Sequence, residues 1–362
     1  MPAAIGEARI VARIESAFQV DGMNERMTEV RWGIIGCGAV TEVKSGPALA
    51  KAGHSRLVAV MRRDARLAAD FASRHQVPRW YADATDLIHD PDVNAVYVAT
   101  PPNLHKAYAI QCMEAGKPVY VEKPMALNAQ ACAEMLAASR ANDTPLFVAY
   151  YRRRLPRFLK IRELIASGAC IGTPRFVTCM LHRPLESRYR NPADLPWTVI
   201  PEISGGGLFV DLACHTLDIL DFLFGEITSV RGHASSQSNA YPAEDCVSMS
   251  FLFRNGMHGC GMWNFASHER YDEVRVVGSE GQIVFSTFGA GDIVVTRPGE
   301  PEQRFAIENP VHIQQPLIEC VVESLTGANT CPPDLDPAHA ARTSWVMDQV
   351  LNEYRISRNL QA

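Results

Sequence analysis

The sequence predicts an α/β protein with two domains, a doubly wound parallel sheet followed by an α+β domain with a mainly antiparallel sheet. Three observations support this fold class. The chain has 362 residues, which suggests two domains at the usual size of roughly 150 residues each. From Val30 onward, short apolar runs alternate with helical patterns, as in a parallel sheet covered on both faces. After Tyr150 the apolar residues recur at every second position over long stretches, as in antiparallel strands.

Apolar runs in the first domain are expected to form its strands. Apolar residues at helical spacing separate these runs over 64–75, 104–115 and 128–141. Asp64, Asn103 and Asn128 stand near the starts of these segments, and we predict them as helix N-caps because their side chains can accept backbone hydrogen bonds. The runs cover residues 31–35, 57–61, 95–99, 118–121 and 146–149.

The second domain is expected to begin with a helix around 156–167 and to continue mainly as a sheet. Apolar residues occupy every second position of 247–253 before Arg254-Asn255-Gly256 breaks the pattern, which predicts a hairpin. Further strands are expected at 175–181, 227–233, 257–265, 273–277 and 282–285, and helices at 313–326 and 337–354.

These patterns divide the chain into four segments. Residues 1–29 form an N-terminal extension, 30–150 the first domain, 151–336 the second domain, and 337–362 a C-terminal helix and tail. The first residues lack a basic region followed by a continuous apolar core, so we expect no secretory signal. A helical arm, an unstructured lead and an unused upstream start all stay open for residues 1–26, because Met27 stands just before the first strand.

Composition and charge exclude several classes of protein. Hydrophobic residues make up 47% and charged residues 21% of the chain, which argues against disorder. The net charge of −5 gives no basic footprint for nucleic acid or an anionic membrane. Charged side chains interrupt the most apolar stretch, 208–224, so no membrane helix of about 20 apolar residues is expected. Ten cysteines without a C-x-x-C pair predict reduced thiols, a cytoplasmic protein and no structural metal.

A glycine-rich turn follows the first predicted strand. In Gly36-Cys37-Gly38-Ala39-Val40-Thr41 the glycines allow a tight turn and let backbone N–H groups approach a pyrophosphate. Thr41 stands where the usual pattern has Gly or Ala. Such a turn is often only a turn, but its place between a strand and a helix predicts a dinucleotide site formed by Gly36 to Val40.

The second strand ends in Arg62-Arg63, where an NAD-specific site usually carries an acidic residue for the ribose 2′-hydroxyl. Two guanidinium groups can instead bind a 2′-phosphate with charge-assisted, bidentate hydrogen bonds. The pair therefore favours NADP(H), with NAD(H) as the other option. The alternative interpretation is that Arg62 and Arg63 are solvent-exposed side chains at the start of a helix.

Glu122-Lys123-Pro124 places a lysine at the carboxyl end of a predicted parallel strand, the edge at which ligands bind in such sheets. Proline keeps Lys123 out of the helical region, and a cis Lys–Pro bond is compatible with the sequence. Lys123 is a candidate catalytic residue, although a lysine at a strand end is often a solvated surface charge.

The helix predicted over 208–224 carries the strongest chemical signal. At 100° per residue, Asp211, His215 and Asp218 form one narrow polar stripe on an otherwise apolar helix. Buried carboxylate and imidazole groups are costly without partners, so the stripe should face a hydrogen-bond network or a polar cavity. Ser204 is a predicted N-cap, and Gly205-Gly206-Gly207 leaves room for a ligand. The alternative to a functional role is that His215 is a purely structural residue.

These features together resemble the Gfo/Idh/MocA oxidoreductases over residues 30–354. The resemblance implies a Rossmann domain followed by an α+β domain whose open-faced sheet forms a homodimer or homotetramer interface. The motifs that carry it are Gly36-Cys37-Gly38, Ala99-Thr100-Pro101-Pro102-Asn103-Leu104-His105, Glu122-Lys123-Pro124, Tyr150-Tyr151-Arg152-Arg153, and Gly205-Gly206 with Asp211 and His215.

The resemblance also implies roles for individual residues. Lys123, Asp211 and His215 are expected to form the catalytic group. Lys123 also borders the cofactor, whose ribose and nicotinamide are expected to contact Thr100, Asn103, His105 and Glu122. Arg154-Leu155 replaces the family's frequent Phe-Asp, so this sequence departs from the usual pattern on the substrate side. From position and chemistry, the substrate-binding candidates are Tyr151, Arg152, Arg153 and Trp197, together with Asp211 and His215.

The reaction expected from these residues is hydride transfer between NADP(H) and a secondary alcohol or ketone of a sugar, anhydro sugar or cyclitol. His215 is expected to exchange the hydroxyl proton, because histidine has a reference pKa of about 6.5. Asp211 would orient the ring, and Lys123 would stabilise negative charge or itself act as the acid–base. Two alternatives stay open: an NAD-dependent glycoside hydrolase with transient redox, and a non-catalytic NADP(H)-binding regulator.

Overall fold

The computed structural model describes residues 27–328 and 335–360. The prediction for residues 1–26 lies outside the described residues, as does the end of the predicted tail. Contacts gather the described chain into two units. The first unit contains described residues of 27–100, 104–149 and 312–341, and the second contains 101–103, 150–311 and 342–360.

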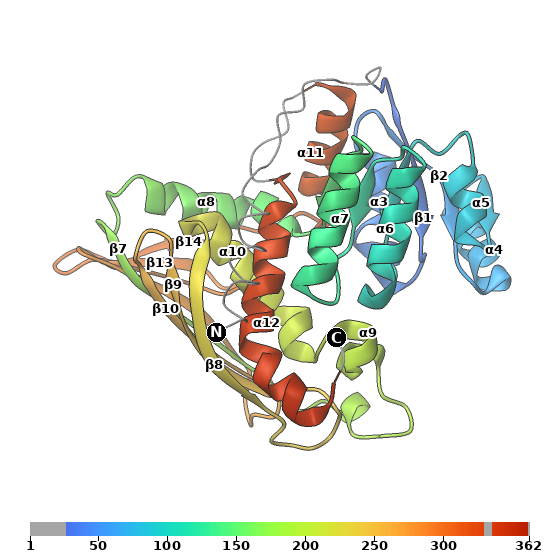
Figure 1. Cartoon of the computed structure of the whole chain (residues 1–362). Coiled ribbons are helices and arrows are strands. Elements are labelled where there is room, and N and C mark those ends of the chain that lie inside the picture. The colour runs from blue at the N-terminus through green and yellow to red at the C-terminus, as the bar shows by residue number, and fades with distance from the viewer. Residues whose placement is uncertain (1–26, 329–334, 361–362) are drawn as a thin grey trace. The chain divides into compact units, whose positions relative to one another are not determined.

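The first unit is built on a six-stranded parallel sheet of order β3-β2-β1-β4-β5-β6. Figure 1 labels its strands β1 and β2. This is the predicted doubly wound sheet, and its central strands are buried because helices cover them. The edge strand β3 was not predicted, since it has three residues with no buried position. The strands are β1 (Val30–Ile35), β2 (Ser55–Met61), β3 (Arg79–Tyr81), β4 (Ala95–Val98), β5 (Val119–Val121) and β6 (Leu146–Val148).

Side-chain caps confirm two of the three predicted helix starts in this unit. Asp64 accepts hydrogen bonds from the backbone N–H groups of Arg66 and Leu67, and Asn128 accepts one from Ala131. The prediction for Asn103 is wrong, because a 3₁₀ turn, η1 (Pro102–Leu104), takes up this residue before the helix begins. The α-helices are α2 (Ala39–Val43), α3 (Gly46–Lys51), α4 (Ala65–Arg74), α5 (Ala84–His89), α6 (His105–Glu114), α7 (Ala129–Ala141) and α11 (Gln315–Thr326).

Residues 312–328 and 335–341 pack with the first unit, although the sequence pattern placed most of them in the second domain. Helix α11 lies against α3 and β1. Just before this helix, Gln314 is buried and accepts a 3.0 Å hydrogen bond from the Tyr120 hydroxyl of β5. Long-range contacts of this kind leave no local mark in the sequence, so periodicity alone could not assign the segment.

The second unit is built on a mainly antiparallel sheet of order β14-β13-β12-β11-β7-β10-β9-β8. Only the β10–β7 pair among these strands is parallel. The hairpin predicted at Arg254-Asn255-Gly256 joins β9 to β10, with Gly256 at φ +83°. The strands are β7 (Pro174–His182), β8 (Ile227–Ser235), β9 (Cys246–Phe253), β10 (His258–Asn264), β11 (Tyr271–Gly278), β12 (Gln282–Phe285), β13 (Ile293–Thr296) and β14 (Gln303–Phe305).

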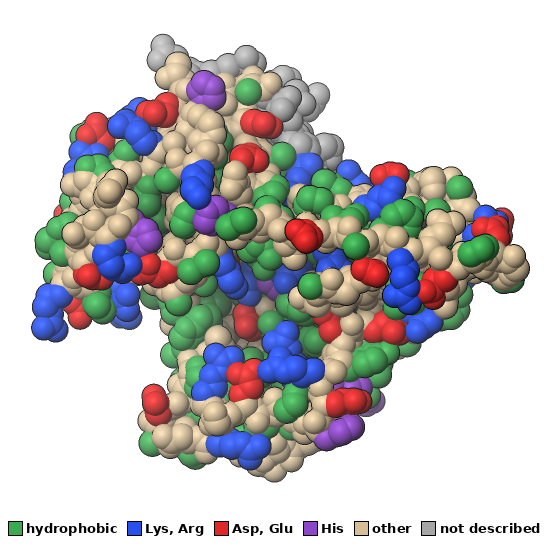
Figure 2. Space-filling model, turned by 180° about the vertical axis from the view of Figure 1, so that it is seen from behind, with side chains coloured by type: hydrophobic (Ala, Val, Ile, Leu, Met, Phe, Trp, Pro, Cys, Tyr) green, Lys and Arg blue, Asp and Glu red, His purple; other side chains and the backbone are tan. Residues whose placement is uncertain are grey.

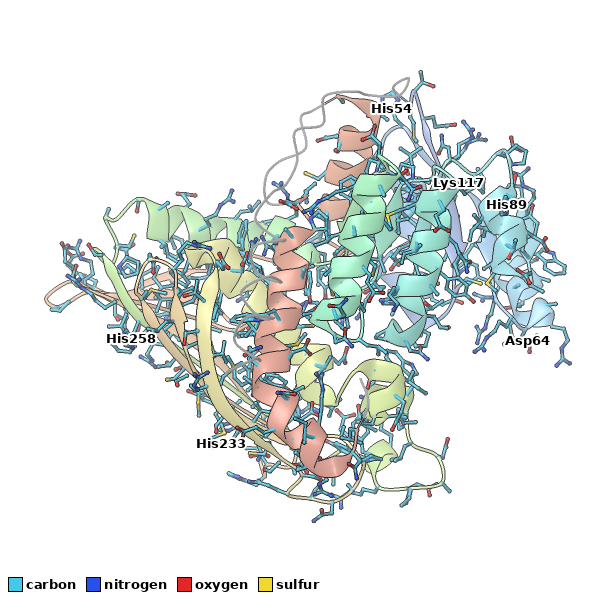
Figure 3. The ribbon with its side chains drawn as sticks, viewed as in Figure 1. His54, Asp64, His89, Lys117, His233 and His258 are labelled. Atoms are coloured by element: carbon cyan, nitrogen blue, oxygen red, sulfur yellow. The ribbon has the colours of Figure 1, made fainter. Side chains whose placement is uncertain are left out.

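Helices cover one face of this sheet through aromatic contacts. The Phe158 ring of α8 lies 6.2 Å from Phe285 of β12, and Phe224 of α10 lies 5.5 Å from Phe253 of β9. The other face is exposed at alternate positions, such as His258 of β10, which Figure 3 labels. The helices are η2 (Tyr151–Arg154), α8 (Pro156–Ala166), η3 (Ser187–Tyr189), η4 (Trp197–Val199), α9 (Pro201–Ser204), η5 (Phe209–Ala213), α10 (Cys214–Phe224) and α12 (Ala338–Arg358).

The surface carries charges of both signs. On the face shown in Figure 2, Lys and Arg side chains are interspersed with Asp and Glu side chains. This mixture agrees with the small net charge of −5. Among the described helices, none is both long enough and apolar enough to cross a membrane.

Candidate active site

The glycine-rich turn between β1 and α2 has the backbone conformation that a dinucleotide site needs. Gly36 has φ +95°, and a Cβ atom at this position would lie 2.9 Å from the backbone nitrogen of Thr100. The N–H groups of Gly36 and Cys37 donate to the carbonyl of Met61. Ala39 and Val40 are the first residues of a helix, so their N–H groups have no acceptor within it. These exposed N–H groups are the ones best placed for phosphate oxygens.

Thr41, the departure from the usual glycine pattern, closes the turn with its hydroxyl group. The hydroxyl donates to the carbonyl of Gly38 at 2.8 Å and accepts from the N–H of Gly38 at 2.9 Å. The residue is fully buried, and a Cβ on Gly46 would lie 2.2 Å from its carbonyl oxygen. Close helix packing is therefore achieved by a glycine five positions later in the chain.

Arg62 and Arg63 are exposed at the end of β2, beside the glycine-rich turn. The Nη1 of Arg62 donates to the carbonyl of Cys37 at 3.3 Å, so this guanidinium group folds back over the turn. The adjacent carboxylate, Asp64, caps α4 through two backbone N–H groups, and Figure 3 labels it. The structure thus brings the Arg62 guanidinium group to the turn, with Arg63 next to it in the chain, and engages the adjacent Asp64 carboxylate as a helix cap.

Thr100 and His105 lie at the carboxyl end of β4 and hold the neighbouring backbone. The buried Thr100 hydroxyl has no hydrogen-bond partner among the described residues, which fits a role as donor or acceptor to a cofactor hydroxyl. His105 is fully buried, with Nε2 2.7 Å from the Thr100 carbonyl and Nδ1 3.0 Å from the Pro124 carbonyl. Burial lowers the pKa of His105. It links two backbone segments and is not open to solvent, whereas Asn103 is exposed.

Glu122 is the centre of a buried hydrogen-bond network that fixes the backbone at Lys123. Its Oε1 accepts from the Tyr97 hydroxyl at 2.5 Å and from the Gln314 amide at 2.7 Å. Its Oε2 accepts from the backbone N–H of Lys123 at 3.1 Å. The Lys123–Pro124 peptide bond is cis, the isomer that the sequence allowed. The lysine side chain is partly exposed, so it is held by a rigid backbone and can still reach a ligand.

Asp211 lies on a π-helical turn, where the sequence predicted a regular α-helix. The five-residue turn η5 runs directly into α10, which begins one residue before His215. Single π turns of this kind are frequent at functional sites. The Ser204 N-cap prediction is wrong: its hydroxyl donates to the carbonyls of Ile200 and Gly206 and closes the preceding helix α9. The polar stripe survives in part, since Asp211 is partly exposed while His215 and Asp218 are buried.

The glycine run before η5 is fixed by a buried carboxylate that the sequence analysis missed. Glu244 accepts a 2.7 Å hydrogen bond from the N–H of Gly207, whose carbonyl accepts from the N–H of Asp211. A Cβ on Gly207 would lie 2.6 Å from the Glu244 carbonyl. Glycine is therefore required for this approach, and burial raises the pKa of Glu244 to about 7.

Aromatic rings surround the imidazole of His215. Its ring centroid lies 6.1 Å from Tyr150, 5.4 Å from Tyr151 and 5.8 Å from Phe288, in each case with the two rings steeply inclined. Phe288 comes from the loop after β12 and had no signal in the sequence pattern. These rings fix the orientation of the imidazole within the second unit.

Two consecutive arginines of η2 differ sharply in their surroundings. Arg153 donates to the carboxylates of Asp218 and Asp221, so its charge is already neutralised inside the protein. We therefore assign Arg153 a structural role. Arg152 donates to the Tyr151 hydroxyl and the Thr287 carbonyl, and its guanidinium carbon lies 4.6 Å from the centroid of the Phe288 ring.

The predicted site residues fall in both units. The first unit contains the glycine-rich turn, Arg62, Arg63 and Lys123, while the second contains Asp211, His215 and the substrate-side candidates. Trp197 lies in η4 and is 41% exposed. No group of three or more His, Cys, Asp and Glu side chains within the described ranges could hold a metal ion.

Comparison with known proteins identifies the family. A model of the oxidoreductase family with an NAD-binding Rossmann fold matches residues 30–150, and the GFO/IDH/MocA C-terminal domain matches residues 158–284. The chain belongs to the Gfo/Idh/MocA oxidoreductase family. The family resemblance and the fold class predicted from the sequence are confirmed.

Curated relatives of this family member are named as oxidoreductases and dehydrogenases. Oxidoreductase P35 of Formosa agariphila is 40% identical over 321 residues, which cover 89% of this chain and 98% of the relative. The trans-1,2-dihydrobenzene-1,2-diol dehydrogenase of Mus musculus is 31% identical over 235 residues, covering 64% and 67% of the two chains. The protein is an NAD(P)-dependent oxidoreductase.

Solved structures show the same fold at low sequence identity. A levoglucosan dehydrogenase in complex with NADH and levoglucosan has a TM-score of 0.76 at 21% identity, covering 90% of this chain and 98% of that one. An aldose-aldose oxidoreductase from Caulobacter crescentus in complex with glycerol has a TM-score of 0.79 at 22% identity, covering 92% and 98%.

Proposed function

We propose that this oxidoreductase transfers a hydride between NADP(H) and a secondary alcohol or ketone of a sugar, anhydro sugar or cyclitol. The observation that carries the proposal is the arrangement of Asp211 and His215. Both lie at the junction of η5 and α10, with aromatic rings and Arg152 around the imidazole. Such a setting suits a group that exchanges a proton with a polyhydroxylated ligand.

The residues of the first unit that would hold the cofactor are the glycine-rich turn, Thr100 and the Arg62-Arg63 pair. When bound, the nicotinamide supplies the hydride donor or acceptor. The unpartnered Thr100 hydroxyl and the N–H groups of Ala39 and Val40 fit hydroxyl and phosphate oxygens respectively. Arg62 and Arg63 support a preference for the 2′-phosphate of NADP(H).

In the proposed mechanism His215 exchanges the proton of the substrate hydroxyl. During oxidation the substrate carbon loses a hydride while the hydroxyl proton moves to the imidazole, and reduction reverses both transfers. Asp211 positions the histidine, because it lies in the π-helical turn that leads directly into α10. Lys123 is proposed to stabilise negative charge on the same oxygen.

The proposed substrate class rests on the names of related proteins together with the local chemistry. One relative is named as acting on a vicinal diol, and one structural neighbour contains an anhydro sugar. Aromatic faces and arginine donors, as found around His215, suit ring-shaped polyols.

A substrate screen and two variants test this function. Polyols and keto-sugars are screened for absorbance change with NADP⁺ and NADPH, in parallel with NAD⁺ and NADH. On the best substrate, Lys123→Ala and His215→Ala should each lower kcat by about 100-fold or more. Cofactor Kd, measured separately, should change by less than about 3-fold for His215→Ala.

The matched controls are Lys44→Ala and His233→Ala, since both side chains are exposed and stand outside the proposed machinery. Figure 3 labels His233 on β8. Both controls should keep wild-type kcat. Retained turnover in both Lys123→Ala and His215→Ala would remove the mechanism.

We also propose that the protein is a homodimer or homotetramer that uses the uncovered face of the eight-stranded sheet. Strand register aligns Leu252, His258, Phe176 and Val277 in one row across four neighbouring strands of this face. Phe176 is 41% and Leu252 36% exposed, and exposed apolar side chains arranged in this way favour association with a second copy.

A further inference from the structure

The starting observation is the buried charge of Arg152, which lies against two of the aromatic rings that contact His215. Arg152 is 6% exposed, yet among the described residues no carboxylate forms an ion pair with it. Its neighbour in sequence, Arg153, is equally buried and contacts two carboxylates. A buried guanidinium group normally requires an anionic partner, because removing the charge from water is costly. The contrast shows that the fold supplies such a partner to one arginine and not to the other.

A second arginine reaches the same place from a different strand. Arg183 follows β7, is partly buried, and has its guanidinium carbon 5.1 Å from the centroid of Phe288. Within the described ranges its guanidinium group forms no ion pair or hydrogen bond. Burial lowers the pKa of Arg183 despite the nearby charges of Asp272 and Asp211. Two guanidinium groups thus lie over the ring that also contacts His215.

The loop that presents Phe288 is held through its backbone. Asp272 of β11 accepts from the N–H groups of Thr287, Phe288 and Gly289 at 2.6 to 3.0 Å. Arg157 of α8 donates to the carbonyls of Gly289 and Gly291. The aromatic ring is therefore kept in place by contacts that do not use its own side chain.

These hydrogen bonds also determine which charged side chains near Phe288 are available to bind a ligand. Both oxygens of the Asp272 carboxylate are engaged by the loop, and Arg157 is engaged by the loop carbonyls. Stacking on Phe288 orients Arg152 and Arg183 while leaving N–H groups at the edges of their planes. Such groups bind oxyanions with paired, charge-assisted hydrogen bonds.

We propose that Arg152 and Arg183 bind an oxyanion carried by the substrate, so that the preferred substrates are acidic sugars or related hydroxy acids. This inference rests on the proposed function, because it places the acidic group next to the histidine that exchanges the hydroxyl proton. The oxyanion is a carboxylate or the sulfate or phosphate of a sugar ester, since all three accept paired hydrogen bonds from guanidinium groups. Phe288 is the platform that holds both arginines.

The first test compares matched acidic and neutral sugars. D-Glucuronate, D-galacturonate and D-gluconate are compared with D-glucose, D-galactose and D-glucitol, and glucose 6-phosphate and glucose 6-sulfate provide the ester arm. At least one acidic compound should exceed its neutral partner about 10- to 100-fold in kcat/KM, as expected for hydrogen bonds between charged groups. Arg183→Gln should remove that difference and change kcat/KM for neutral sugars by less than about 3-fold.

Arg304→Gln is the matched control, because Arg304 is an exposed arginine of β14 whose partners are surface carboxylates. It should keep the acidic preference. Arg183→Lys retains a point charge but not the planar fork, so it should keep only part of the preference. Arg152→Gln removes the hydrogen-bond donor to the Thr287 carbonyl, so this variant can fail to fold. Arg183→Gln still tests the oxyanion site in that case, because the Arg183 side chain makes no hydrogen bond within the described residues.

Binding of the same compounds, measured by calorimetry on the NADP⁺-loaded protein, separates this inference from the proposed function. Tighter binding of acids that disappears in Arg183→Gln supports the inference even if no compound is turned over, in which case only the proposed function fails. Turnover of neutral sugars without any acidic preference overturns the inference and leaves the function standing. Lack of acid-dependent binding across the whole panel, inorganic sulfate included, also overturns it.

Discussion

At the scale of single residues, this protein departs from the usual dinucleotide-binding pattern at Thr41, and neighbouring residues compensate for the missing glycine. Thr41 occupies a glycine position of the nucleotide turn, and its hydroxyl satisfies both backbone polar groups of Gly38. Gly46 then supplies the close approach that the missing glycine would have given. Asp64 caps a helix, so its carboxylate is already engaged at the end of β2, where we propose that Arg62 and Arg63 bind the cofactor.

The arginine pair leads to a prediction on cofactor choice. Replacing both residues, Arg62→Ala with Arg63→Ala, should raise KM for NADP⁺ by about 10- to 100-fold, because charge-assisted bonds to the 2′-phosphate are lost. KM for NAD⁺ should stay within about 3-fold, since NAD⁺ lacks that phosphate. The control is Arg66→Ala, a neighbouring arginine whose side chain is 93% exposed. Equal losses with both cofactors would count against a 2′-phosphate site.

At the scale of elements, a π-helical turn and a buried acid place the candidate catalytic side chains of the second unit. Glu244 holds Gly207, and Gly207 holds the first turn of η5 at Asp211. Arg153 ties η2 to α10 through Asp218 and Asp221, and Arg342 of α12 joins the same carboxylate of Asp221. Three helices therefore meet around buried ion pairs close in sequence to His215.

The buried acid gives this element a pH-dependent stability. Because burial raises the pKa of Glu244 from 4.5 to about 7 in the folded state, the unfolded chain loses this proton first as pH rises. The unfolded state then binds fewer protons than the folded state, so the Glu244 contribution falls between pH of about 4.5 and 7, by about 3 kcal/mol in total. Glu244→Gln keeps an oxygen for the Gly207 N–H and removes the titration.

Urea unfolding at pH 5, 6, 7 and 8 measures this effect. The free energy of unfolding of Glu244→Gln, measured relative to that of the wild type, should increase as pH rises across this range. Glu302→Gln, which alters an exposed carboxylate on the loop before β14, should show no such trend. A wild-type-to-variant difference that is constant with pH would contradict the assignment.

At the scale of the whole molecule, one large sheet face is not covered by any helix of residues 27–328 and 335–360. In the second unit, α8 and η5–α10 cover the inner face through contacts such as Phe209 with Trp263, whose ring centroids lie 5.3 Å apart. The opposite face presents a mixture of apolar and polar side chains at alternate positions of its strands. A sheet face of this size is a natural surface for a second copy of the chain.

The oligomer proposal predicts a concentration-dependent mass that one charged residue disrupts. In sedimentation at micromolar protein the wild type should behave as a dimer or tetramer, and Phe176→Asp should shift it toward the monomer by at least about 10-fold in Kd. Val311→Asp is a control, because Val311 is apolar and 91% exposed but lies outside the sheet. A wild-type monomer would refute the proposal.

Periodicity in the sequence was sufficient for the main elements of the fold and for the nucleotide turn. Strand β12 and the hairpin at Gly256 follow directly from local patterns, because alternation and turn residues act over a few positions. The π-helical turn at Asp211 was not predicted, since the same residues fit a regular helix. Glu244 and Phe288 were missed because each acts through contacts with residues far away in the chain.

What the sequence determined by itself is the class of protein: a dinucleotide fold, a second antiparallel domain, and a family signature that carries Lys123, Asp211 and His215. The tertiary structure alone decided that Arg153, and not the adjacent Arg152, is neutralised by carboxylates. It alone also brought Arg183 and Arg152 to the same ring, that of Phe288. The physical reason is that hydrophobic periodicity and turn residues act over a few neighbouring positions, whereas the charge left on a buried group depends on every element packed around it.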